Sequence, residues 1–209
     1  KTEKLLSKST ELSICMSCAV GFGIAAIARV FVPLFFGEGY EKCVNLLVLF
    51  VPVLFVKSLI NVFDQQYLIP AKCDNQYTLA VTGGAIVNLI CNGLLIPQLG
   101  SVGATLGTLM AELSVLIVSA HCAKKEIRFF RMFSRYSYYL LLGLIMFIAV
   151  RFFDSYSHIE RSFIRLILMI MIGGGVYSLL CLTVWLKVKE KSVFGSILIS
   201  LSKKGAIRK

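Results

Sequence analysis

The stretch Tyr77–Ala120, YTLAVTGGAIVNLICNGLLIPQLGSVGATLGTLMAELSVLIVSA, decides the fold of this chain. It contains two apolar runs of helical length, joined by the sequence IPQLG at residues 96–100. A helix that rises about 1.5 Å per residue needs about 20 apolar residues to cross about 30 Å of hydrocarbon, so each run is long enough to span a membrane. Asn88, Asn92 and Glu112 lie inside these runs, where a polar side chain is costly and suggests a function.

The composition of the whole chain is that of a membrane protein. Hydrophobic residues make up 57% of the 209 residues, charged residues make up 16%, and the mean hydropathy is +0.82. A soluble domain has about 25% charged residues. None of the apolar runs shows the strict alternation of a transmembrane β-strand. The sequence therefore predicts an all-α polytopic transmembrane helical bundle with six spans: Leu12–Phe36, Cys43–Phe63, Tyr77–Ile96, Gly100–Ala120, Ser137–Phe153 and Ile164–Leu186.

The net charge of +11 is distributed by loop and not gathered on one soluble module, so it gives no indication of nucleic-acid binding. Because basic loops favour the cytoplasmic side, both termini are expected in the cytoplasm. The side that we assign to the cytoplasm carries these basic residues: Lys1, Lys4, Lys8, Lys72, Lys124, Lys125, Arg128, Arg131, Arg135, Lys187, Lys189, Lys191, Lys203, Lys204, Arg208 and Lys209.

Residues 1–209 are expected to form a single transmembrane bundle, and the chain is expected to be a fragment because Lys1 is not a start methionine. A short interfacial helix is predicted at about residues 192–202, where apolar positions recur before a basic pair. The seven cysteines lie mostly within the spans and are predicted to be small packing residues. No enzyme, metal or cofactor constellation accompanies them, so we predict neither catalytic residues nor a cofactor.

Two sets of small or polar residues lie on helix faces in the 77–120 hairpin. Gly100, Gly103 and Gly107 recur along one face, which predicts close helix packing, with a hinge for conformational change as the alternative. Asn88 and Asn92 are four residues apart and share a face. They are expected either to form interhelical hydrogen bonds or to line a polar path.

Three charged residues within the spans are candidates for a substrate cavity. Arg29 and Lys57 are near enough to helix ends for their side chains to reach toward the interface, whereas Glu112 is too deep to do so. An ion pair between Lys57 and Glu112 is conceivable, and a basic group in a central cavity could attract phosphate. Asp64 is expected in a solvated cytoplasmic loop.

Several motifs resemble the C-terminal half of Wzx-type polysaccharide flippases, which belong to the multidrug, oligosaccharidyl-lipid and polysaccharide exporter superfamily. The resemblance covers residues 10–120 best. The motifs, in chain order, are PLFFGEGY at residues 33–40, LIP at 68–70, GGAIVNL at 83–89 followed by Asn92, LIPQLGSVGA at 95–104, and AE at 111–112.

The resemblance implies a bacterial plasma-membrane flippase that moves undecaprenyl-diphosphate-linked oligosaccharide repeat units for capsule or O-antigen synthesis. It implies alternating access between two helical lobes, of which this chain is the C-terminal one. The implied partners are the lipid-linked oligosaccharide, the bilayer, the missing N-terminal lobe and the polysaccharide polymerase machinery. Arg29 and Lys57 are hypothetical headgroup contacts, and Glu112 is a coupling or structural acid.

Other functional classes stay open at the level of the sequence. A drug/cation antiporter of the MATE type or a lipid II flippase would share the pattern of helices. A membrane scaffold without transport activity would use the glycine face to bind partner helices. A glycan polymerase or ligase would need large outer loops, and the predicted outer loops here are short.

Overall fold

The computed structural model describes residues 2–123, 134, 137–157 and 162–188. The helix predicted at residues 192–202 lies outside this part of the chain. The helices, with their bounds, are α1 (Thr2–Phe36), α2 (Glu41–Phe63), η1 (Asp64–Leu68), α3 (Asp74–Leu99), α4 (Ser101–Ala123), α6 (Tyr138–Tyr156) and α7 (Ser162–Val188).

Six helical segments are long and apolar enough to cross a membrane, which confirms the predicted all-α polytopic fold. Each segment overlaps one predicted span. They are Ser7–Phe36, Glu41–Leu68, Asp74–Leu99, Ser101–Cys122, Tyr138–Tyr156 and Ser162–Leu186.

The second span is longer than predicted because a π-helical turn follows α2 without a break. The amide of Ile69 donates to the carbonyl oxygen of Asp64 over 3.0 Å, and the amide of Cys73 donates to that of Leu68 over 2.9 Å. These are the i to i+5 bonds of a π-helix, a geometry that is frequent at functional sites. Asp64 is only 7% exposed in this turn, so the expectation of a solvated loop residue is wrong.

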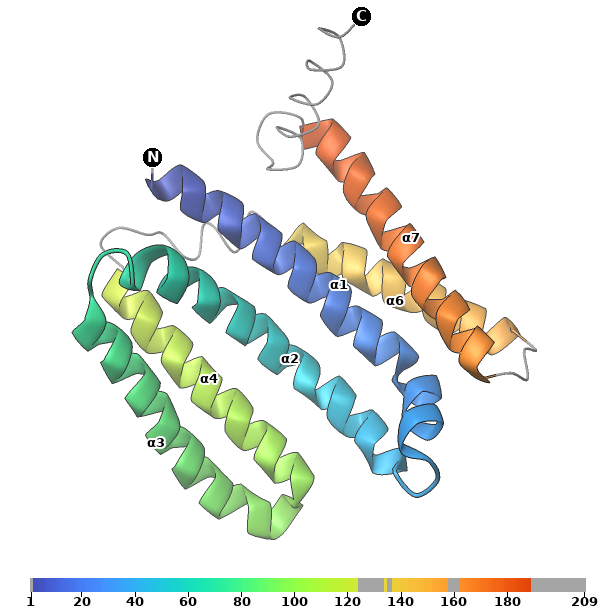
Figure 1. Cartoon of the computed structure of the whole chain (residues 1–209), viewed down its shortest axis with the longest axis horizontal. Coiled ribbons are helices and arrows are strands. Elements are labelled where there is room, and N and C mark those ends of the chain that lie inside the picture. Colours follow the sequence, from blue (N-terminus) through green and yellow to red (C-terminus); the bar gives the residue numbers. More distant parts are fainter. Residues whose placement is uncertain (1, 124–133, 135–136, 158–161, 189–209) are drawn as a thin grey trace, which may run out of the picture.

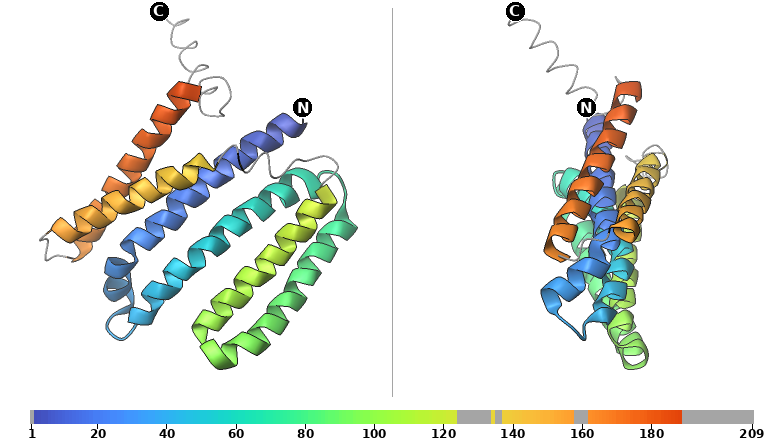
Figure 2. Two further views of the ribbon diagram at one scale, coloured as in Figure 1. Left: turned by 180° about the vertical axis from the view of Figure 1, so that it is seen from behind. Right: turned by 90° about the vertical axis from the view of Figure 1, so that its right-hand side faces the viewer.

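The helices lie side by side in one layer. Along the layer the order is α3, α4, α2, α1, and α6 and α7 both pack against α1 and against each other (Figure 1). Seen along its edge, the layer is narrow (Figure 2, right). Consecutive helices from α1 to α4 alternate in direction, so α2 and α4, which are two helices apart in the chain, run parallel where they touch.

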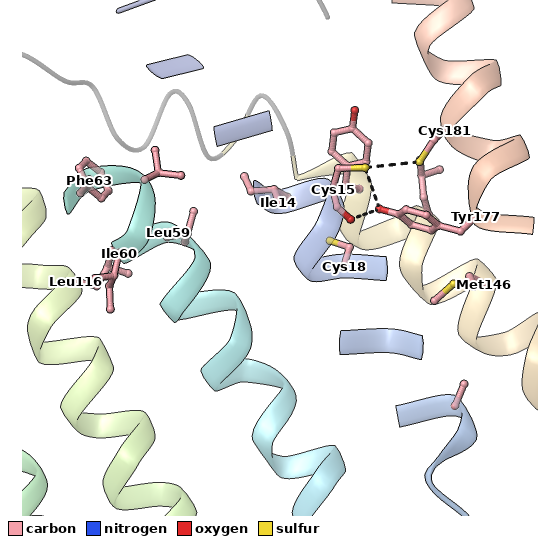
Figure 3. Packing of buried hydrophobic residues seen from close by; sticks show 14 of the residues in the cluster. Ile14, Cys15, Cys18, Leu59, Ile60, Phe63, Leu116, Met146, Tyr177 and Cys181 are labelled. Atoms are coloured by element: carbon pink, nitrogen blue, oxygen red, sulfur yellow. Dashed lines mark hydrogen bonds between the residues drawn. The ribbon is translucent and has the colours of Figure 1, made fainter. Parts of the chain in front are cut away.

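The packing between α1 and α7 is built from small and sulfur-containing side chains. The Tyr177 hydroxyl donates to the carbonyl oxygen of Cys15 over 2.8 Å, and the Cys15 and Cys181 sulfurs are 4.0 Å apart (Figure 3). Cys15, Cys18 and Cys181 are buried and form no disulfide. They allow the two helix backbones to approach, because small side chains are what membrane helices use for packing.

A buried polar network joins α1, α6 and α7 at one end of the layer. The Tyr139 hydroxyl donates to Glu11 Oε1 over 3.0 Å, and the Trp185 indole N–H donates to the Tyr139 oxygen over 2.8 Å. Glu11 and Tyr139 are both fully buried. Because these three residues come from α1, α6 and α7, the network fixes the relative positions of those helices.

Candidate functional site

An ion pair connects α2 and α4 in the middle of the layer. The Lys57 ammonium lies 2.9 Å from Glu112 Oε1 and 3.1 Å from Oε2, so it donates to both carboxylate oxygens. Glu112 is midway along α4, roughly 16 Å from either end at about 1.5 Å per residue. Lys57 is roughly 17 Å from Leu68, where the second span ends. The pair is therefore near the centre of the membrane.

A second polar contact lies two helical turns farther along the same two helices. The Ser119 hydroxyl donates to Asp64 Oδ1 over 3.3 Å, and both residues are buried. Lys57 and Asp64 are seven residues apart, and so are Glu112 and Ser119. Parallel helices bring positions seven apart to the same seam. We call these four residues the α2–α4 polar seam.

The exposure of the ion pair is uneven. The Lys57 side chain is 52% exposed, whereas that of Glu112 is 18% exposed. A charged side chain that is half-exposed at this depth cannot face hydrocarbon without a large energetic penalty, so it needs water or another polar surface beside it. The open face of the seam is consequently the side of the layer suited to an aqueous cavity.

The two asparagines belong to α3, and Asn92 faces Gly107 of α4. Asn92 Nδ2 donates to Asn88 Oδ1 over 2.9 Å, so the two side chains bond to each other within one helix. The remaining oxygen, Asn92 Oδ1, is buried against Gly107 and accepts no hydrogen bond from the described residues. The asparagines therefore belong to the α3–α4 interface and do not join the ion pair.

The glycines of this hairpin have different roles. A Cβ atom at Gly103 would collide with the Leu95 backbone, and one at Gly107 would collide with Asn92, so both glycines allow α3 and α4 to touch. Gly100, which the sequence pattern grouped with them, instead forms the turn between α3 and α4. Its φ of +57° lies in the left-handed region that favours glycine, and a Cβ atom there would meet open space.

Arg29 lies apart from the polar seam. Phe22 of α1 packs on Phe55 of α2 at 6.0 Å between ring centroids, which sets the level of the two antiparallel helices. From that level Arg29 and Lys57 extend in opposite directions and are separated by roughly 13 Å along the helix axes. Arg29 is exposed and makes no ion pair with the residues that the structure describes.

A second charged cluster, not predicted from the sequence, links α6 to α7. Asp154, which is 8% exposed, accepts from Arg151 Nη1 over 3.1 Å and from Arg165 Nε over 2.8 Å. Arg165 Nη2 also donates to the Asp154 carbonyl oxygen over 3.0 Å. The i, i+3 spacing of Arg151 and Asp154 is visible in the sequence, but the contact with Arg165 depends on how the two helices pack.

An apolar groove of about 710 Å³ runs between α1 and α7, with α6 as its floor. Its walls include Val20 and Ile24 from α1 and Ile170 and Leu182 from α7, and Met146 lies at its base. Since these helices cross the membrane, the groove is open to the bilayer and suits a hydrocarbon chain.

Within the described residues no group of three or more His, Cys, Asp or Glu side chains is placed to hold a metal ion. The molecule thus combines an ion pair at the membrane centre, a buried carboxylate two helical turns away, and an apolar groove. Comparison with family models, with curated proteins and with solved structures gives no match to this chain.

Proposed function

We propose that this chain is part of a flippase that moves undecaprenyl-diphosphate-linked oligosaccharide repeat units across the bacterial plasma membrane. The observation that carries the proposal is the Lys57–Glu112 pair, which lies near the membrane centre with the Lys57 side chain half-exposed. A membrane-embedded charge that faces water or a cavity marks a pathway for a polar substrate. A cation at that position suits a diphosphate headgroup, because the attraction of opposite charges is stronger away from bulk water.

Two further features agree with a lipid-linked substrate. The groove between α1 and α7 is open to the bilayer and apolar, as the hydrocarbon tail of such a substrate requires. The helices form an open layer, which another helical lobe would cover to enclose a cavity for alternating access. The sequence motifs that resemble Wzx-type flippases lie on the same helices as the charged pair.

The orientation is a separate prediction, with both termini in the cytoplasm. In a cysteine-free background, we expect Glu38→Cys, between α1 and α2, to react with an impermeant maleimide in intact spheroplasts. Asn75→Cys, at the start of α3 beside Lys72, should react only after the membrane is opened, because the basic side faces the cytoplasm. Both positions are exposed, so exposure alone cannot separate them. The reverse labelling pattern would contradict the orientation.

The proposed function is tested by polysaccharide export in a strain that depends on the full-length protein. At equal membrane abundance, Lys57→Ala and Arg29→Ala should each reduce surface polysaccharide at least several-fold and cause lipid-linked repeat units to accumulate inside. Lys42→Ala is the matched control, since Lys42 is an exposed lysine at the beginning of α2. Unchanged export in both variants would contradict the headgroup role.

One observation favours a second candidate, an antiporter for drugs or cations. Two carboxylates, Asp64 and Glu112, lie within the seam, and carboxylates in a membrane pathway bind cations or protons. Altered drug resistance with normal surface polysaccharide in the strain that lacks the protein would favour this candidate. Loss of neither property would favour a membrane scaffold.

A further inference from the structure

Lys57 is placed so that a second anion could reach its ammonium without unpacking the helices. The side chain is 52% exposed, and Glu112 lies beneath it at 18% exposure. An ammonium carries three protons, and the two carboxylate oxygens take two of them. The ammonium makes no other hydrogen bond or ion pair in the described part of the chain. The accessible side of the ion pair is therefore its cationic side.

From this geometry we infer that Lys57 is an anion-binding group and that Glu112 is its internal occupant, which a phosphate group displaces. The inference deepens the proposed function and rests on it only for the identity of the anion. A diphosphate carries more negative charge than one carboxylate, so it competes well for a single ammonium at low dielectric. Before the anion arrives, the same carboxylate keeps the ammonium from being an unpaired charge in the membrane.

Displacement leaves the Glu112 carboxylate without its cation. The other charged group near it is Asp64, from the π-turn, which interacts electrostatically with both Lys57 and Glu112. On α3 the level of Glu112 is occupied by Asn88, and the single charged residue of that helix, Asp74, is in its first turn. On α4 itself His121 is more than two turns away. The lost pairing with Lys57 therefore opposes binding of the anion, and Glu112→Gln removes that opposition.

An exchangeable ion pair and a purely structural one predict different changes in anion affinity for one substitution. Removing the charge of Glu112 removes the competitor, so Glu112→Gln should bind the anion more tightly, whereas Lys57→Gln should not bind it. A pair that only stabilises the fold would give no gain of affinity from either change. The sign of the Glu112→Gln effect therefore separates the two roles.

The experiment measures binding of inorganic diphosphate to the purified full-length protein in nanodiscs, by isothermal titration calorimetry. We expect Glu112→Gln to lower the dissociation constant at least tenfold and Lys57→Gln to abolish binding, while Lys57→Arg retains it. Lys42→Gln is the control, because it removes an exposed lysine outside the seam. Thermal unfolding of each variant checks that it is folded. If Lys57→Gln does not fold, Lys57→Arg still tests whether a cation at this position binds the anion.

Unchanged or weaker diphosphate affinity in Glu112→Gln would overturn the inference. If Glu112→Gln binds diphosphate more tightly but Lys57→Ala exports polysaccharide normally, the anion site stands and the flippase function is contradicted.

Discussion

Gly103→Ala is expected to destabilise the protein by about 1 to 3 kcal/mol, the range for overpacking a tight interface. The added Cβ atom would collide with the carbonyl group of Leu95 and come within 2.9 Å of the Ile96 nitrogen. These are backbone atoms of α3, so no side-chain rotation can relieve the contact, and α3 must move away from α4. Thermal unfolding in detergent, followed by circular dichroism, should show the loss as a lower midpoint.

Gly93→Ala is the matched control for this substitution. Gly93 is on α3 in the same hairpin, but a Cβ atom there would meet no other atom within 4 Å. Alanine favours a helix interior over glycine by about 1 kcal/mol, so this variant should be unchanged or slightly more stable. Equal midpoints for the two variants would contradict a close approach of α3 and α4 at Gly103.

Asp154→Asn is expected to produce the second large loss of stability, about 2 to 3 kcal/mol. Asp154 is buried and accepts hydrogen bonds from Arg151 and Arg165, so the amide would leave two guanidinium groups without a counter-charge. Breaking a fully buried pair costs about 3 to 5 kcal/mol. The two arginine side chains are 28% and 30% exposed, so solvent reduces the effect.

Asp74→Asn provides the comparison for Asp154→Asn, measured by the same thermal unfolding. Asp74 is exposed in the first turn of α3 and forms no ion pair with a described residue. Its charge interacts only with the positive end of the helix dipole, worth about 0.3 to 1 kcal/mol. A midpoint for Asp154→Asn that matches the Asp74→Asn value would show that the arginines find other partners.

The helices of this chain could be predicted from the sequence because each span is a long apolar run, and length and hydropathy suffice to identify such runs. Local chemistry at their ends was harder to predict. The second span continues to Leu68 because Asp64 begins a π-helical turn. From the sequence a loop was expected there, since the polar residues Gln65 and Gln66 follow Asp64. Pro97 lies within the last turns of α3, where a linker was expected.

The candidate site was only partly predictable for a related reason. Depth alone indicated that Glu112 needs a partner, and an ion pair with Lys57 was conceivable. The sequence placed Lys57 near a helix end, and its central position follows only from the continuation of the second span to Leu68. The contact of Asp64 with Ser119 depends on the parallel register of α2 and α4, which no local pattern reveals. The pairing of Asp154 with Arg165 likewise depends on how α6 and α7 pack, and it was missed.

The seven-residue spacing in the α2–α4 polar seam has a consequence for alignment. In a membrane, apolar side chains contribute little free energy toward one helix register over another, since lipid is equally apolar. If α4 slid two turns along α2, Glu112 would lie opposite Asp64, and two carboxylates would repel each other. A slide in the other direction would place Ser119 opposite Lys57 and leave Glu112 without a cation. Of these three registers, only the observed one pairs unlike charges. The polar seam therefore selects the alignment of α2 with α4.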